Sequence, residues 1–267
     1  MNDSVASPRA ALPAEEAPPR DAASVVLLRD GPSGLEVLLQ RRHPDARVLG
    51  GWYVFPGGKL DEADCDTGQA ACLDLSADQI HARLHEPLTP ASRAMGLYVA
   101  ALRELWEEAA IDLRGQASAL QPWSRWITPK NPPVGSHRFD TRFFLALMPA
   151  GQTAKHDHHE TIDTLWLNPR DALERYWQRD IELIPPQLMA LAQLARHGDT
   201  RAAWQEAGQR RPPCIEPVHF MDGPHRAMCY PGDALHPVSE RALPGPTRLR
   251  MVDRRFEPFE GFGGWFQ

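Results

Sequence analysis

One short run of the sequence combines residue types that could bind a metal ion. It extends from Arg103 to Glu108 and reads R-E-L-W-E-E. Residues three and four apart are neighbours on a helix, so Glu104, Glu107 and Glu108 would share one face while apolar side chains occupy the other. A hard cation such as Mg²⁺ binds oxygen ligands of this kind. The run is typical of a carboxylate metal site, and also of an ordinary solvated acidic face.

The residues upstream of this run favour the metal site. Phe55-Pro56-Gly57-Gly58 ends a short apolar stretch, and glycines let the backbone approach a ligand closely. A strand, a glycine loop and an acidic helix together predict a site for a metal ion and a phosphate group. Carboxylate ligation without histidine favours Mg²⁺ or Mn²⁺ over zinc or copper.

Hydrophobic patterns predict the elements that position this site. Ala23 to Arg29 and Leu35 to Gln40 flank a turn rich in glycine and proline, which predicts a hairpin. Trp52 to Phe55 predicts a third strand, and the carboxylate helix is expected over about residues 89–110, with proline at its first position. Further strands are expected at residues 138–147 and 162–167, and further helices at residues 170–177 and 185–197.

Composition divides the chain into three parts. Residues 1–22 are rich in alanine and proline without periodicity, so a disordered leader is expected. Residues 23–200 carry the motifs and form the expected main domain. Residues 201–267 are rich in proline and glycine, with short strand-like runs, and are expected to form a β-rich extension packed on that domain. The alternative is an arm that joins two subunits of a homodimer.

The glycine loop and the acidic run resemble the box of the Nudix hydrolase family, G-x5-E-x7-R-E-U-x-E-E-x-G-U, in which U is a bulky aliphatic residue. Gly58 stands at the first glycine, and the run from Arg103 with Ile111 matches the second half. Asp64 stands where the family has glutamate and is expected to serve as a salt-bridge partner. Ala110 replaces the last glycine, which predicts a helix end that needs no positive φ.

The spacer within the box is the third departure from the family pattern. It holds 38 residues instead of seven, so about 31 are inserted, over about residues 65–91. Ser76 and Gln79 form a capping-box pattern that predicts a short helix over residues 80–85. Loop closure costs rise slowly with length, so both halves of the box can still assemble. The insertion is expected to form a helical cap beside the pocket.

The resemblance implies a fold and a set of roles. The implied fold is an α/β/α sandwich around a mixed sheet. The implied metal ligands are the Gly57 carbonyl and the carboxylates of Glu104, Glu107 and Glu108. Arg103 would orient the glutamates, and the general base would be Glu107 or Glu160. The run from His156 to Glu160 has residue types of a second metal site, but we favour a polar, solvated loop.

A second pattern bears on the substrate. Arg42, Arg47, Gly51 and the block from Phe55 to Gly58 resemble the coenzyme A signature of one Nudix subgroup, L-L-T-x-R-[SA]-x3-R-x3-G-x3-F-P-G-G. Gln40 and a histidine at position 43 depart from it. The resemblance implies that these residues bind substrate, and arginine grips phosphate bidentately. The alternative is that both arginines are surface residues at a strand end.

The long insertion also resembles the peroxisomal acyl-coenzyme A diphosphatase branch and its bacterial relatives. The expected activity is therefore hydrolysis of the diphosphate of coenzyme A or acyl-coenzyme A, giving (acyl)phosphopantetheine and adenosine 3′,5′-bisphosphate. One alternative is a pyrophosphatase for ADP-ribose, NADH or another nucleotide diphosphate. The other is a ligand-binding regulator without activity, which has no need of clustered glutamates.

Charge and composition exclude other classes. The net charge of −6 gives no sign of the basic surface that nucleic-acid binding requires. No stretch is long and apolar enough to predict a membrane span. The four cysteines form no C-x-x-C pair, which suits a reducing compartment. A cytoplasmic protein that acts on a small nucleotide diphosphate is expected.

Overall fold

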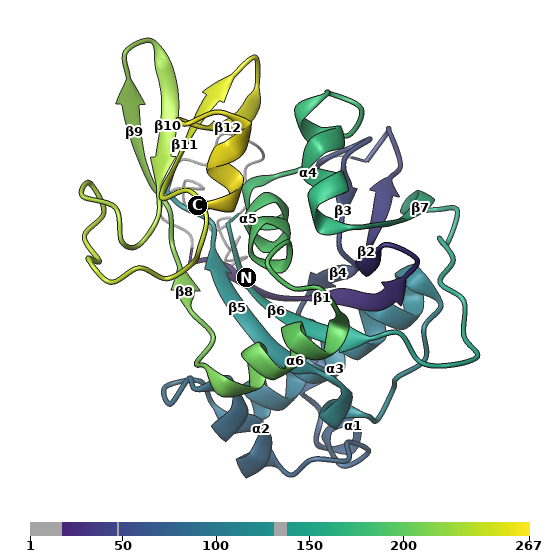
Figure 1. Cartoon of the computed structure of the whole chain (residues 1–267). Helices are drawn as coiled ribbons and strands as arrows, with labels where there is room; N and C mark the ends of the chain where they lie inside the picture. The colour runs from purple at the N-terminus through teal and green to yellow at the C-terminus, as the bar shows by residue number, and fades with distance from the viewer. Residues whose placement is uncertain (1–17, 47, 131–137) are drawn as a thin grey trace, which may run out of the picture.

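The computed structural model of the chain describes residues 18–46, 48–130 and 138–267. Within these residues a mixed sheet of eight strands has the order β3-β2-β1-β6-β5-β8, with β4 paired to β1 and β7 paired to β2 (Figure 1). Its strands are β1 (Arg20–Gly31), β2 (Gly34–Arg42), β3 (Tyr53–Val54), β4 (Gly57–Lys59), β5 (Gln121–Ile127), β6 (Phe139–Leu147), β7 (Thr161–Leu167) and β8 (Cys214–Ile215).

The predicted hairpin is present, and its first strand is longer than expected. β1 and β2 pair antiparallel up to Gly31 and Gly34. β1 begins at Arg20 because it pairs in parallel with β6 from that residue onward. This pairing joins segments far apart in the sequence, so the hydrophobic pattern near residue 20 could not predict that the strand begins there. Residues 1–17 of the expected leader lie outside the described residues.

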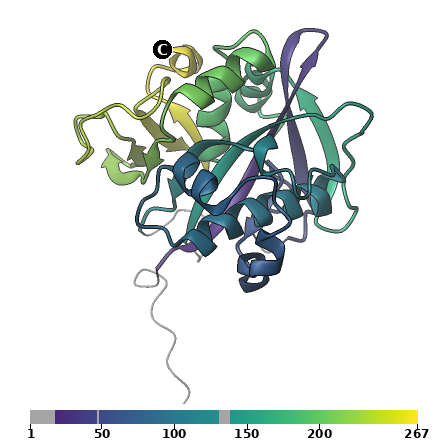
Figure 2. The ribbon, with the colours of Figure 1, turned by 90° about the horizontal axis from the view of Figure 1, so that it is seen from below.

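Helices cover both faces of the sheet, as an α/β/α sandwich requires (Figure 2). They are α1 (Thr67–Ala70), α2 (Ala77–Leu84), α3 (Ala91–Ala109), α4 (Pro169–Trp177), α5 (Pro185–Leu194) and α6 (Thr200–Gln209). One core cluster lies between the sheet and α2 and α3, and a second between the sheet and α4, α5 and α6. The expected fold is confirmed, including the capping box of α2 at Ser76.

The main domain also contains three elements that the sequence did not predict: the strands β5 and β8 of the sheet, and the helix α6. β5 contains Pro122 and places Trp123 and Trp126 in the core. α6 begins at Thr200 and buries Ala203 and Ala207 in the core cluster that it shares with α4 and α5. β8 follows it and pairs in parallel with β5. The expected boundary at residue 200 therefore falls in front of a helix that packs on the main domain.

The rest of the C-terminal segment forms a second, antiparallel sheet of order β12-β11-β10-β9. Its strands are β9 (Val218–Asp222), β10 (His225–Cys229), β11 (Arg248–Val252) and β12 (Arg255–Pro258). Tyr176 of α4 donates its hydroxyl to the Phe256 carbonyl at 3.0 Å and accepts the Phe256 N–H at 2.8 Å. The β-rich extension thus packs on the main domain of its own chain.

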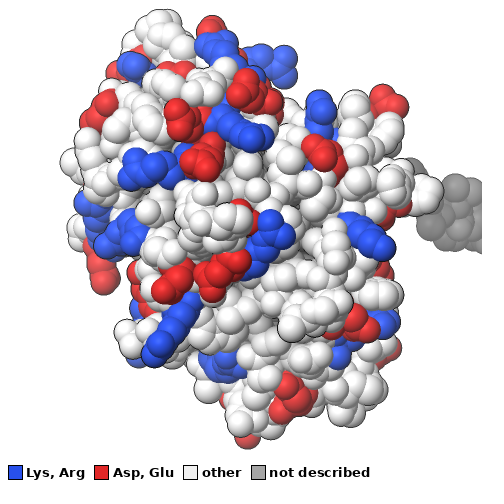
Figure 3. All heavy atoms as spheres, turned by 45° about the vertical axis from the view of Figure 1, so that its right-hand side comes forward, with Lys and Arg blue, Asp and Glu red and all other residues white. Residues whose placement is uncertain are grey.

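The surface shown in Figure 3 carries acidic and basic side chains intermixed, without a broad field of one sign. An anionic ligand on this face would therefore be held by individual groups. Among the described residues, no helix has the length and apolar character needed to cross a membrane.

Candidate active site

The carboxylate helix is α3, and its apolar sector lies against the sheet. Leu97, Ala101 and Leu105 are fully buried, and Glu108 is nearly so, while the side chain of Glu104 is 14% exposed. Glu107 is farther round the helix, with its side chain about half exposed. The helix ends at Ala110 with φ 56°, so the expectation of an end without positive φ is wrong. Helices commonly end on a left-handed residue, and alanine adopts that conformation at a cost of about 1–2 kcal/mol.

The glycine loop lies directly against this helix. β4 pairs with β1 at Ala23 and Ser24, and the Gly57 N–H donates to Oε2 of Glu108 at 2.9 Å. A Cβ at Gly57 would lie 2.5 Å from the Ala23 carbonyl oxygen, and one at Gly58 would overlap the carboxylate of Glu104. The close approach of the loop to β1 therefore requires Gly57, and a side chain at Gly58 would displace the Glu104 carboxylate.

Arg103 joins the two halves of the box across the insertion. Its Nε and Nη2 donate to the two oxygens of Asp64, both at 2.9 Å. Its Nη1 donates to Glu104 at 2.8 Å and to Glu107 at 2.9 Å. The expected salt bridge of Asp64 is confirmed, and Arg103 contacts two of the three glutamates that it was expected to orient.

Burial disfavours the charged form of two glutamates of α3, Glu104 and Glu108. Burial raises the pKa of Glu108, which is 4% exposed, to about 8, against the lowering effect of the Gly57 N–H and of Arg42. Burial also raises the pKa of Glu104, and the negative charges of Glu107 and Glu160 add to this effect. A pair of crowded, desolvated carboxylates is the arrangement that a bound cation would stabilise.

The end of β2 supplies polar groups to the same place. Gln40 is fully buried, and its Nε2 donates to the backbone carbonyl of Glu108 at 2.8 Å, which caps the last turn of α3. Two residues further on, Arg42 lies 3.9 Å from the carboxylate of Glu160. The sequence showed Gln40 only as a departure from a motif. Strand alternation was the available signal, because it places Leu38, Gln40 and Arg42 on one face.

The structure brings together Arg42, Gly57, Gly58, Glu160 and the box residues of α3. Gly51 and Phe55, which were also expected to bind substrate, make contacts within the fold, and the Gly51 N–H donates to the Arg42 carbonyl at 3.1 Å. Gly51 has φ 80° and forms a turn whose carbonyl accepts from Arg41. Phe55 is 2% exposed and packs edge-on against Phe143 in the core. Arg47 lies outside the described residues.

The loop from His156 to Glu160 is organised around Asp157. The rings of His156 and His158 are 4.2 Å apart. Among the described residues, however, no group of three His, Cys, Asp or Glu side chains has the arrangement of a metal site. This also applies to the carboxylates of α3, two of which are turned toward Arg103.

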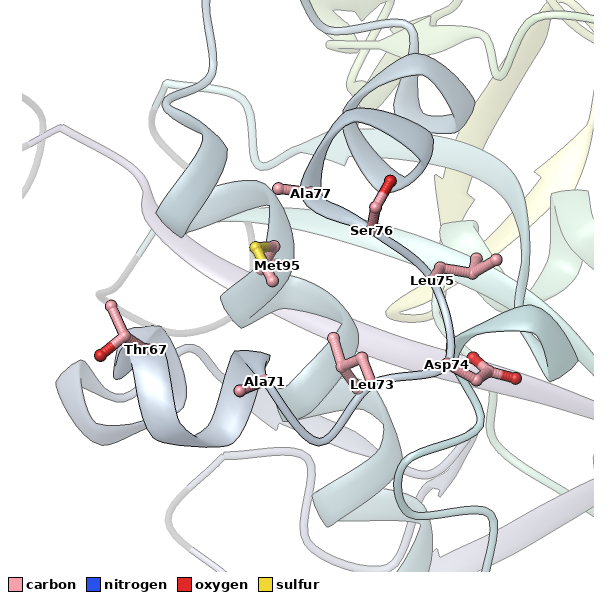
Figure 4. Close-up of a pocket in the computed structure, with 8 residues that line it drawn as sticks. All are labelled: Thr67, Ala71, Leu73, Asp74, Leu75, Ser76, Ala77 and Met95. Atoms are coloured by element: carbon pink, nitrogen blue, oxygen red, sulfur yellow. The ribbon is translucent and has the colours of Figure 1, made fainter.

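A groove of about 450 Å³ lies in the insertion (Figure 4). Its lining residues are Thr67, Ala71, Leu73, Asp74, Leu75, Ser76, Ala77 and, from α3, Met95. Met95 precedes Glu104 by nine residues, which at about 100° per residue places the two on opposite sides of the helix. The inserted helix is present as predicted, and this groove lies across α3 from Glu104.

The sequence of the chain is similar to those of several known proteins. The family model described as the NUDT19 Nudix domain matches residues 108–194. A protein of Caenorhabditis elegans named as a nudix hydrolase is 24% identical over 88% of this chain and 80% of its own length. The acyl-coenzyme A diphosphatase NUDT19 of Xenopus laevis is 39% identical over 28% of this chain, which covers 20% of that relative.

A solved structure shows the same fold. The crystal structure of a NUDIX hydrolase from Alicyclobacillus acidocaldarius superposes with a TM-score of 0.56 at 24% identity, covering 71% of this chain and 97% of that chain. The chain thus has the Nudix fold, and its sequence is similar to Nudix hydrolases, in particular to the NUDT19 branch.

Proposed function

We propose that the chain hydrolyses the diphosphate bond of coenzyme A or acyl-coenzyme A, with Mg²⁺ or Mn²⁺ as cofactor. The products are (acyl)phosphopantetheine and adenosine 3′,5′-bisphosphate. The observation that carries the proposal is the buried Glu108 carboxylate, held by the Gly57 N–H and influenced by the charges of Glu104, Arg42 and Glu160. The similarity to relatives named acyl-coenzyme A diphosphatase, which match 28% and 45% of the chain, supports the substrate class.

The donor types at this site suit a hard divalent cation. The ligands we assign are the Gly57 carbonyl and the carboxylates of Glu104, Glu107 and Glu108, all oxygen donors of the kind that Mg²⁺ and Mn²⁺ prefer. The raised pKa values of the two inner glutamates support the fit, because a cation offsets the cost of burying negative charge. When bound, such an ion polarises the diphosphate and lowers the pKa of an attacking water.

The chain's own groups supply the remaining chemistry. Glu160 is the proposed general base, with Glu107 as the alternative. It accepts a proton from water as the water oxygen bonds to phosphorus and the bridging P–O bond breaks, so the second phosphate leaves with the bonding electrons. Arg42 is the proposed phosphate-binding group; its Nε is buried, without a hydrogen-bond partner in the part of the chain that the structure describes. Arg103 holds the ligand helix in register with the glycine loop.

A substrate panel tests the proposal. Coenzyme A, an acyl-coenzyme A, dephospho-coenzyme A, ADP-ribose and NADH are incubated with Mg²⁺ or Mn²⁺, and products are identified by mass. We expect adenosine 3′,5′-bisphosphate from the coenzyme A substrates and the highest kcat/KM for one of them. Preferred cleavage of NADH or ADP-ribose would replace the proposal by the dinucleotide alternative. Binding without turnover would indicate a regulator. The cytoplasmic location and the homodimer stay predictions from the sequence.

A further inference from the structure

We propose that Asp157 is a positioning residue that fixes the backbone of Glu160 opposite Arg42 and the carboxylate helix. The inference rests on the proposed function, in which Glu160 is the general base. It concerns a residue that the sequence showed only as part of a polar, histidine-rich run.

The Asp157 carboxylate organises the loop that leads into β7. Its Oδ1 accepts the backbone N–H of His159 at 3.1 Å, of Glu160 at 3.1 Å and of Thr161 at 2.8 Å, and the Thr161 hydroxyl at 3.0 Å. Its Oδ2 also lies 3.1 Å from the Glu160 nitrogen. These donors and the burial of the carboxyl act in opposite directions, and the pKa of Asp157 is lowered on balance. One ionised side chain therefore satisfies three consecutive backbone N–H groups around Glu160.

A second set of contacts ties this loop to β2. The His43 N–H donates to the Glu160 carbonyl at 2.8 Å. Thr161 is fully buried and is the register partner of Arg42. Asp157 holds the backbone on one side of Glu160, and β2 holds it on the other. The Cα of Glu160 is thereby placed beside the arginine that we assign to phosphate.

The side chain of Glu160 has no comparable support of its own. It is 65% exposed, and its nearest ion-pair partner is Arg42 at 3.9 Å. A solvated carboxylate suits proton transfer, but its long side chain samples several rotamers. Small displacements of a reacting group lower rates strongly, so the backbone must supply the positioning. Asp157 is the group that makes most of the contacts to that backbone.

Four single variants and one double variant test the inference with the full chain and the best substrate of the panel. Glu160→Gln should lower kcat by about 10²- to 10⁴-fold, the range of general-base effects. Asp157→Ala should lower kcat by about tenfold or more with KM within about threefold, as expected for loss of an interaction that acts mainly in the transition state. Asp157→Asn keeps an acceptor at Oδ1 and should restore kcat to within about threefold of the parent.

The matched control is Asp199→Ala. Asp199 is also an aspartate that accepts a backbone N–H, that of Ala202 at 2.8 Å at the start of α6, but it does not contact the Glu160 loop. It should lower thermal stability to a similar degree and leave kcat unchanged. An equal loss of kcat in both alanine variants would overturn the proposal, because it would show a general effect of destabilisation.

The double variant Asp157→Ala/Glu160→Gln separates positioning from an independent role. If Asp157 acts through Glu160, the double variant is no slower than Glu160→Gln, since neighbouring effects of this kind are not additive. If the two losses multiply, the proposal is wrong. Parent-like activity of Glu160→Gln would end both the base assignment and the positioning role.

Hydrogen exchange tests, without any substrate, whether Asp157 holds the backbone of Glu160. The amides of Glu160 and Thr161 should exchange faster in Asp157→Ala than in the parent, and at parent rates in Asp157→Asn and Asp199→Ala. Unchanged exchange in Asp157→Ala overturns the inference even where the enzyme is active. If the parent hydrolyses none of the panel, the proposed function fails, and exchange still decides whether Asp157 holds this backbone.

Discussion

The Gly57 N–H and the Glu108 carboxylate form a hydrogen bond of 2.9 Å across 51 positions of the sequence. The contact bridges the insertion and brings the glycine loop to the helix that carries the proposed metal ligands. Glu108 is nearly fully buried at this point. The contact that assembles the site therefore also buries Glu108, and this burial raises the pKa of its carboxyl group.

Glu108→Gln should lower turnover by about three orders of magnitude or more, because it removes a charged ligand while keeping the side-chain shape. The folded state should persist, since the amide still accepts from Gly57. Steady-state kinetics with Mg²⁺ or Mn²⁺ and circular dichroism measure the two effects. Glu174→Gln, on the exposed face of α4, removes the same charge away from the site and should be neutral. Activity of Glu108→Gln within a few-fold of the parent would refute the metal role of α3.

Stability of the metal-free chain should fall as pH rises above about 5. The folded-state pKa of Glu108 is raised from 4.5 to about 8 by burial, so between these values the folded chain binds more protons than the unfolded chain. The free energy of unfolding then decreases with pH, at most by about 1.4 kcal/mol per unit from this group. Urea titrations in a chelator should show a smaller decrease for Glu108→Gln. Parallel curves for both proteins would contradict the burial effect.

Gly58→Ala should abolish most activity, because the new Cβ would overlap the Glu104 carboxylate. The Glu104 carboxylate, which is the end of a flexible side chain, must move to make room, and this movement displaces a proposed metal ligand. Gly68→Ala is the matched control, since a Cβ there has no atom within 4 Å among the described residues. We expect the control to retain parent kcat/KM. Equal activities of the two variants would show that the loop does not need its close approach to α3.

Arg42→Ala should distinguish two roles for this arginine. If it binds the 3′-phosphate of coenzyme A, kcat/KM for coenzyme A falls by about 10- to 150-fold, the value of one charge-assisted hydrogen bond, and that for dephospho-coenzyme A hardly changes. If it binds the diphosphate, both substrates lose equally. Arg41→Ala is the control, since Arg41 precedes Arg42 and points to the opposite face of β2. No change in Arg42→Ala would mean that this arginine is only a surface residue.

The sequence by itself determined the elements that local patterns encode. Alternating apolar runs gave the β1–β2 hairpin, the spacing of Glu104, Glu107 and Glu108 gave the acidic face of α3, and a capping box gave α2. These features depend on residues close in the chain, so periodicity and turn chemistry report them directly. The salt bridge from Asp64 to Arg103 was also predictable, from the family pattern.

Only the tertiary structure decided how these elements meet. It brought the Gln40 side chain to the Glu108 carbonyl, 68 positions away. The groove of the insertion lies across α3 from Glu104. The helix α3 ends at Ala110 in the left-handed conformation. The tertiary structure also assigned Asp157 to the backbone of Glu160. Such contacts depend on which faces of distant segments are pressed together as the core closes, and residue spacing along one segment carries no information about its partner.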